Sequence, residues 1–432
     1  MKDVWRIALP MILSNISVPL LGMVDTGVTG HLDDAVYLGA VAIGSAIFGF
    51  LYTGVNFLRM GTTGIAAQQY GAGDYDGLRV SLGQALVVAQ CVALLLLLLQ
   101  QPLGAFALGL LDPASNVAAE ASVYFSIRIW SAPATLANYA LIGWFIGLQN
   151  ARIPLLIVLT INLTNIVLDL VFVLLLGMTV DGVAAASVIA EFAGLLLGLF
   201  FVVRELRRHP GHWLVHKMTR VHEYAGFFSI NGHLFVRTMA LTFTYFFITA
   251  QGARLGPLVL AANAVLMNLQ NLMSFGLDGL AHAAEALVGK AIGAGNRRAL
   301  QQSVSLTLRW SLYAALGFSA TFFVAGPSLI RLLTDLEDIR DTTFRYLPWM
   351  ILSPLVAVWS FLYDGVFVGA TRAREMRDIM LVSTFLVFVP AWYALRFLGN
   401  HGLWLAFMLF LASRALGMHV FYRCRVLPSQ SG

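Results

Sequence analysis

The chain is poor in charged residues and in cysteine. Asp, Glu, Lys and Arg make up 11% of its 432 residues, whereas soluble globular proteins carry about 25%. The two cysteines, Cys91 and Cys424, are too few and too far apart to form a disulfide framework or a cysteine metal site. The sequence therefore excludes a disulfide scaffold, and it lacks the charged surface expected of a soluble protein of this length.

Long apolar runs are present instead. Hydrophobic residues make up 59% of the chain, and the mean hydropathy is +0.79. A membrane-spanning helix needs about 20 mainly apolar residues, and the short alternating segments typical of a membrane barrel are absent. The sequence therefore predicts an all-α polytopic membrane protein with twelve transmembrane helices. We expect them at about 7–30, 36–60, 78–100, 118–147, 152–176, 183–204, 222–251, 257–286, 299–325, 342–370, 376–398 and 402–424.

The twelve expected spans fall into two sets of six. The longest polar connection lies at 204–220, so we expect an N-terminal lobe at 1–203, a cytoplasmic linker at 204–220 and a C-terminal lobe at 221–432. Lys and Arg residues gather on the side of this linker and of both termini, which the positive-inside rule assigns to the cytoplasm. The formal charge of +5 then reflects topology and contact with anionic membrane lipids, and we expect no nucleic-acid partner.

The two lobes look like copies of one another. The sequence GAGD at 71–74 recurs as GAGN at 293–296, and FIG at 145–147 recurs as FVG at 367–369. Both matches have the same offset of 222 residues. Because each copy contains an even number of spans, the copies should be parallel and related by a pseudo-twofold axis along the membrane normal. We expect substrate to bind between such lobes, with access alternating as they move.

The first expected span contains a carboxylate and two prolines. Asp25 lies within it, and Pro10 and Pro19 interrupt its hydrogen-bonding pattern. A carboxylate inside a membrane span costs about 3 kcal/mol on insertion scales, so it needs a proton or a partner. We interpret the prolines as a hinge in this helix. The alternative for Pro10 is a place in the first helical turn, where proline is well tolerated.

Further polar residues of the first lobe share helix faces with one another. Asn165 and Asp169 are four residues apart, as are Ser187 and Glu191. Together with Asp25 they offer oxygen atoms suited to a proton or a small cation such as Na⁺. Two carboxylates close together in a medium of low dielectric cannot both stay charged, so we expect the site to couple transport to an ion. The alternative for Asn165 and Ser187 is a hydrogen bond between helices.

The second lobe has its own polar candidates. Asp278, His282 and Glu285 follow one another on one helix face, and Asp364 lies late in the tenth expected span. These residues are a second candidate site for the coupling ion. A fully hydrogen-bonded network between helices is the equally supported alternative.

Motifs of other protein classes are incomplete. Asn165 and Asp169 resemble half of the diphosphate-binding motif of membrane prenyltransferases, but Val173 stands where a further aspartate is needed. A lipid-linked precursor flippase is the alternative among transporters, and it should have a more basic cavity, whereas few arginines lie in the middle of the expected spans. We expect no catalytic residues, no cofactor and no metal ion apart from Na⁺ as the alternative coupling ion at Asp25, Asn165, Asp169 and Ser187.

Five stretches of the chain resemble the multidrug and toxic compound extrusion (MATE) family of transporters, in particular its DinF-type branch. In the first lobe they are MVDTGVTGHL at 23–32, AAQQYGAGD at 66–74 and INLTNIVLD at 161–169. In the second lobe they are LDGLAHAAEALVGKAIGAG at 277–295 and YDGVFVGATRAREMR at 363–377. The resemblance covers nearly the whole chain.

The resemblance implies a function and a set of site residues. It implies two six-helix lobes related by pseudo-twofold symmetry that export cationic or amphipathic drugs in exchange for H⁺ or Na⁺. We expect the protein to be a monomer in the bacterial inner membrane. In this branch, bending of the first helix near Pro10 is linked to protonation of Asp25. The cation site of the branch corresponds to Asn165 and Asp169, with Ser187 in place of the usual threonine. The glutamate that the other branch has in its seventh span is missing here, because Glu223 lies at the cytoplasmic start of that span.

Overall fold

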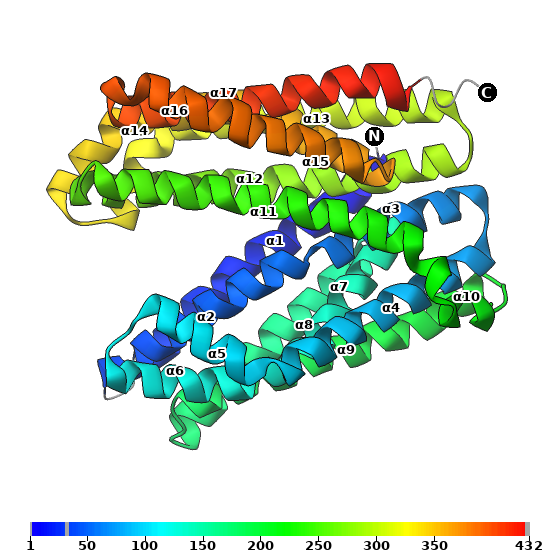
Figure 1. The fold of residues 1–432 in the computed structure, drawn as a ribbon, viewed down its shortest axis with the longest axis horizontal. Coiled ribbons are helices and arrows are strands. Elements are labelled where there is room, and N and C mark those ends of the chain that lie inside the picture. The colour runs from blue at the N-terminus through cyan, green and yellow to red at the C-terminus, as the bar shows by residue number, and fades with distance from the viewer. Residues whose placement is uncertain (1, 31–33, 428–432) are drawn as a thin grey trace. The chain divides into compact units, whose positions relative to one another are not determined.

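The computed structural model describes residues 2–30 and 34–427, apart from the side chain of residue 26. The described residues are almost all helical and contain no β-strand. Figure 1 traces the helices along the chain. The all-α architecture expected from composition is confirmed. Residues 31 and 32 of the first resembling stretch lie outside the described residues.

The chain divides into two compact units. The N-terminal unit contains 13–226, and the C-terminal unit contains 1–12 together with 227–432. One boundary falls inside helix α1 (Lys2–Thr29), two residues after Pro10, and the helix is continuous through both Pro10 and Pro19. The other boundary follows the expected linker at 204–220.

In the N-terminal unit, α7 packs against α3 and α4, α8 packs against α9, and α2 packs against α6. A buried apolar cluster that includes Phe48, Tyr124 and Ile129 fills the space between several of these helices. After α1, the elements of this unit are α2 (Ala35–Val55), α3 (Phe57–Ala72), α4 (Tyr75–Leu98), α5 (Gln100–Leu111), α6 (Ser115–Arg128), η1 (Ile129–Ser131), α7 (Ala132–Gly147), α8 (Arg152–Asp169), the π-helical η2 (Leu170–Leu175), α9 (Val180–Arg208), α10 (Val215–Thr219) and η3 (Val221–Tyr224).

In the C-terminal unit, α14 is the central helix and packs against α12, α13 and α17. Its core includes Met273, Phe322 and Phe407. The elements are α11 (Ala225–Arg254), α12 (Pro257–Gly293), α13 (Arg297–Leu333), α14 (Glu337–Gly369), α15 (Ala373–Leu381), the π-helical η4 (Val382–Phe388), α16 (Val389–Leu395), η5 (Arg396–Leu398), α17 (Asn400–Phe421) and η6 (Tyr422–Val426).

Ten helical runs among the described residues are long and apolar enough to cross a membrane. Two of the twelve expected spans do not appear among these ten runs. The span expected at 118–147 is broken at η1 into α6 and α7, which are 14 and 16 residues long. The span expected at 222–251 corresponds to α11, which has 30 residues but is less apolar because it includes Asn231 and Arg237. The twelve expected spans are therefore consistent with the helices.

The internal repeat appears as a repeated contact. In the N-terminal unit, a Cβ atom added at Gly147 would lie 2.9 Å from the backbone nitrogen of Ala67. In the C-terminal unit, a Cβ atom at Gly369 would lie 3.0 Å from the backbone nitrogen of Gly289. Both residues of the second contact follow those of the first by 222 positions. Each unit therefore uses a glycine at the same place to let two helix backbones approach closely.

Replacing Gly369 by alanine is expected to destabilise the protein. The added methyl group has no room against α12, and overpacking of this kind costs about 1–3 kcal/mol. Gly317→Ala on α13 is the matched control, because nothing lies within 4 Å of a Cβ atom there. Thermal unfolding of both variants in detergent checks the prediction, and equal unfolding temperatures would contradict it.

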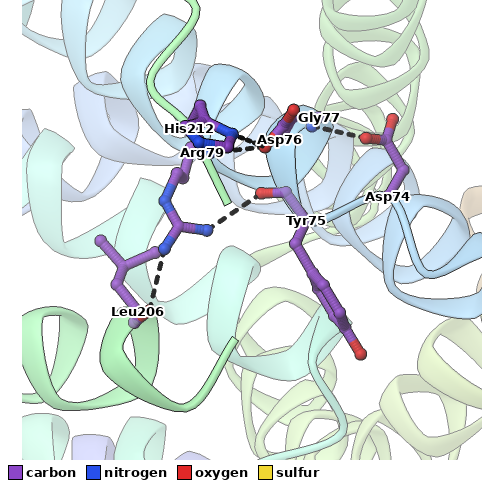
Figure 2. A network of polar contacts seen from close by, with 7 residues as sticks. All are labelled: Asp74, Tyr75, Asp76, Gly77, Arg79, Leu206 and His212. Atoms are coloured by element: carbon purple, nitrogen blue, oxygen red, sulfur yellow. Dashed lines mark hydrogen bonds and ion pairs between the residues drawn. The ribbon is translucent and has the colours of Figure 1, made fainter. Parts of the chain in front are cut away.

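Part of the expected linker is held against the start of α4 (Figure 2). Arg79 donates hydrogen bonds to the carbonyl oxygens of Tyr75, at 3.2 Å, and Leu206, at 2.9 Å. The backbone N–H of His212 donates to the Asp76 carboxylate. The polar connection is thus bonded to the N-terminal unit, and α9 and α10 extend helical structure into it.

Candidate functional site

Two carboxyl groups lie next to each other inside the N-terminal unit. Asp25 lies one turn before the end of α1 and Asp169 is the last residue of α8, and their side chains interact with each other. Asp169 is fully buried. Among the described residues no donor reaches its Oδ1 atom. Because two carboxylates offer only acceptors, a proton shared between them is what turns this contact into a hydrogen bond.

Asn165 and Ser187 complete this group of four. With its amide placed so that both ends are satisfied, Asn165 donates from nitrogen to Asp25 Oδ1 at 3.3 Å. The Asn165 oxygen then accepts hydrogen bonds at 3.2 Å from both the hydroxyl and the backbone N–H of Ser187. The structure thus brings together Asp25, Asn165, Asp169 and Ser187, as the sequence-based interpretation expected.

The local sequence explains this geometry. Asn165 and Asp169 share a helix face because they are one turn apart. After η2 the chain reverses at Gly177, whose φ of 68° is readily adopted only by glycine. Helix α9 then returns along α8, and Gly194 lets the two helices approach, since a Cβ atom there would collide with Ile161. The wider π-helical turn begins directly after Asp169, and such turns often occur at functional sites.

An arginine interacts electrostatically with the carboxyl pair. The Arg128 guanidinium interacts electrostatically with the carboxyl groups of Asp25, Asp169 and Glu191. Glu191 accepts a hydrogen bond from the side-chain amide of Asn138 at 2.9 Å. The predicted site residue Glu191 therefore interacts electrostatically with the same guanidinium as the carboxyl pair.

The second half of α1 is attached to α8 close to Pro19. Asn162 donates a hydrogen bond to the hydroxyl of Ser17 at 2.9 Å, and that hydroxyl donates to the carbonyl of Ser14 at 2.7 Å. Asn162 is one turn before Asn165 on the same helix. A movement of this part of α1 would therefore displace α8 or break the hydrogen bond between Asn162 and Ser17.

The C-terminal unit contains a buried ion-pair triad. Arg237 of α11 and Arg414 of α17 both bind Oδ2 of Asp364 on α14, and the distance from Arg414 is 2.8 Å. All three residues are at most 9% exposed. Asp278 lies near enough to interact electrostatically with Arg414. The candidate Asp364 is thus placed between two arginine guanidinium groups.

The remaining candidates of this unit form a separate pair. Nδ1 of His282 lies 3.4 Å from Oε2 of Glu285 on the same helix, α12, and both residues are buried. Asp278, one turn before His282 on the same helix, interacts electrostatically with Arg414.

Sequence reasoning missed Arg237 and Arg414. It noted few arginines in the middle of the expected spans, yet both lie well inside membrane-length helices and are almost fully buried. The available signal was their position in apolar stretches, because a buried guanidinium requires a carboxylate. The partner could not be found by spacing, since Arg237 and Asp364 are 127 residues apart.

These features define a polytopic membrane protein with a repeated helical fold and an acidic group buried in one unit. The family model MatE matches residues 10–171 and 234–393, and the chain belongs to this family. The resemblance to the MATE family stated from the sequence motifs is confirmed.

Known relatives and solved structures agree with this assignment. The chain is 43% identical to DNA damage-inducible protein F of Escherichia coli (strain K12), with 98% of this chain and 92% of that protein covered. It is 23% identical to multidrug and toxin extrusion protein 1 of Homo sapiens, covering 91% and 70%. It matches a crystal structure of MATE in complex with MaD3S with a TM-score of 0.90 and 17% identity, covering 100% and 96%. The structural likeness shows that the fold is shared.

Proposed function

We propose that the protein exports small cationic or amphipathic organic compounds across the bacterial inner membrane in exchange for protons. Membership of the MatE family supports a transport function rather than catalysis. The names of two similar proteins, DNA damage-inducible protein F and multidrug and toxin extrusion protein 1, support multidrug export. The facing carboxyl groups of Asp25 and Asp169 are the observation on which the proposal depends, because such a pair readily gains and loses a proton.

The groups around the pair favour H⁺ over Na⁺ as the coupling ion. A hard cation such as Na⁺ is bound by several oxygen ligands. In the orientation that satisfies both ends of its amide, Asn165 directs its nitrogen to Asp25 and accepts from Ser187 with its oxygen. Arg128 adds a further donor group near the carboxyl groups. Hydrogen-bond donors around two carboxyl groups suit a shared proton better than a metal ion.

The proposed cycle follows from these contacts. Protonation from outside neutralises the carboxyl pair, which removes the attraction for a cationic substrate. It also changes the bonding between α1 and α8, and α1 bends at Pro10. The substrate then leaves towards the outside. Loss of the proton to the cytoplasm restores the negative charge of the site for the next cation. In the proposed orientation both termini lie on the cytoplasmic side.

Dye efflux from vesicles under separate ion gradients tests this function. A pH gradient alone is expected to drive efflux of a fluorescent monocation such as ethidium by the wild-type protein, and a Na⁺ gradient at equal pH is expected to have no effect. Efflux driven by Na⁺ alone would contradict proton coupling. Absence of dye transport under either gradient, with movement of a lipid-linked diphosphate, would favour the flippase alternative.

A further inference from the structure

A groove of about 500 Å³ lies in the C-terminal unit between α14 and α17, apart from the sites described above. Each of the two helices contributes residues spaced three or four positions apart. They include Leu355, Trp359 and Tyr363 of α14 and Ala412, Leu416 and His419 of α17. Because such residues share one helix face, the groove follows both helices for about two turns, or about 12 Å.

Most of the wall of this groove is apolar and open to the surroundings of the protein. Leu416 is 66% exposed and Leu355 is 36% exposed, although both lie in helices long and apolar enough to cross a membrane. Ala412 is also exposed, and its small side chain leaves the space between the helices open. Lipid tails are as apolar as leucine, so an acyl chain suits this part of the groove.

One end of the groove is polar. The hydroxyl of Tyr363 and Nδ1 of His419 are hydrogen-bonded at 2.5 Å, which joins α14 to α17. When the hydroxyl donates this bond, the hydrogen of the imidazole is on Nε2, which is then a donor. Nε2 has no hydrogen-bond partner among the described residues. The groove therefore combines an apolar wall with a hydrogen-bond donor at one end.

Two arginines follow this polar end. Arg423 and Arg425 lie in η6, directly after α17, and both are exposed. Arg423 comes about one turn after His419. Neither arginine forms an ion pair with an acidic side chain in the part of the chain that the structure describes. Their positive charge is therefore available to an anion at the end of the groove.

We propose that this groove binds an anionic phospholipid of the surrounding membrane. One acyl chain lies along Leu355 and Leu416, and the phosphate group lies near His419, Arg423 and Arg425. Apolar wall, donor and positive charge follow one another in the order of acyl chain and headgroup. Basic sites between transmembrane helices on the cytoplasmic side are typical of anionic lipid headgroups, and we expect this end to face the cytoplasm. The site does not depend on the proposed export function.

Competition between two lipids tests the charged end of the site. Purified full-length protein in detergent receives equal amounts of dioleoyl phosphatidylglycerol, which is anionic, and dioleoyl phosphatidylethanolamine, which has no net charge. Native mass spectrometry measures which lipid stays bound, and the wild type is expected to retain phosphatidylglycerol in preference. Arg423→Gln and Arg425→Gln are each expected to lower the ratio of the two bound lipids about fivefold, the effect of one arginine at a membrane surface.

Arg331→Gln is the matched control for the arginine variants. Arg331 is an exposed arginine in the last turn of α13 and does not line the groove. We expect this variant to keep the lipid ratio of the wild type. Equal retention of both lipids by the wild type, or an unchanged ratio in both Arg423→Gln and Arg425→Gln, would overturn the proposal. Displacement of the bound lipid by free glycerol phosphate would also overturn it, because the groove would then have no part in binding.

Trp359 gives an independent readout of the apolar part of the groove. Its fluorescence is obtained as the difference between the wild type and Trp359→Phe, and a phosphatidylglycerol with brominated acyl chains is expected to quench it more strongly than the brominated phosphatidylethanolamine. Ala412→Phe fills the groove and is expected to remove this difference. Leu409→Phe, an exposed position of α17 outside the groove, is expected to keep it. Equal quenching of Trp359 by both lipids in the wild type would contradict the proposal even if a variant failed to fold.

Discussion

Asp169→Asn is expected to abolish proton-driven dye efflux while the protein still folds. The substitution keeps the size of the side chain, but an amide cannot take up and release a proton at this position. Asp169 is completely buried and its carboxyl group interacts with that of Asp25. Efflux of ethidium from vesicles under an imposed pH gradient measures the effect, and we expect the rate to fall to that of empty vesicles.

Asp112→Asn is the matched control for this prediction. Asp112 is exposed and has a φ of 44°, a conformation that asparagine also adopts readily. We expect it to transport dye like the wild type. Asp25→Asn is expected to behave like Asp169→Asn, because the proposed cycle requires the two carboxyl groups to share one proton. Normal efflux by both Asp25→Asn and Asp169→Asn would move the coupling site elsewhere, and Asp278 would then be examined next.

Asp364→Ala is expected to destabilise the protein by about 3–5 kcal/mol. Asp364 is the shared acceptor of Arg237 and Arg414, and its removal leaves two guanidinium groups buried without that carboxylate. Thermal unfolding in detergent measures this loss. The triad ties α11, α14 and α17 together, so we expect the C-terminal unit to be affected most.

Replacing the whole triad by apolar residues distinguishes an ion pair from an ion-binding site. Arg237→Met, Asp364→Leu and Arg414→Met in one chain are expected to recover much of the stability lost in Asp364→Ala, because no uncompensated charge remains buried. Proton-driven efflux by this variant would show that the C-terminal unit supports the fold without taking the coupling ion. A stable Asp364→Ala variant that has lost efflux would contradict this view and restore Asp364 as a coupling residue.

Patterns within single helices were predictable from the sequence. The apolar runs predicted the helices, and the offset of 222 residues predicted a repeat that the contacts of Gly147 and Gly369 now show. The one-turn spacing of Asn165 and Asp169 predicted a shared face. Each of these inferences depends on local periodicity or on comparison of the chain with itself.

Pairings between distant helices were not predictable in this way. Asp364 was a candidate, but its partners Arg237 and Arg414 follow from how three helices pack and not from any spacing. At the repeat offset, Asp364 corresponds to Ile142, so the first half of the chain gave no hint of the triad. The electrostatic interaction of Arg128 with Glu191 and with the carboxyl pair was not predictable for the same reason.

Proton movement coupled to dye movement tests the central claim most directly. The wild-type protein is placed in liposomes that contain a trapped pH indicator, and an ethidium gradient is imposed with no initial difference in pH or Na⁺. We predict that protons move opposite to the dye, and that they do not move in liposomes containing the Asp25→Asn, Asp169→Asn variant. Dye movement by the wild type without any change in internal pH would contradict proton exchange at the carboxyl pair.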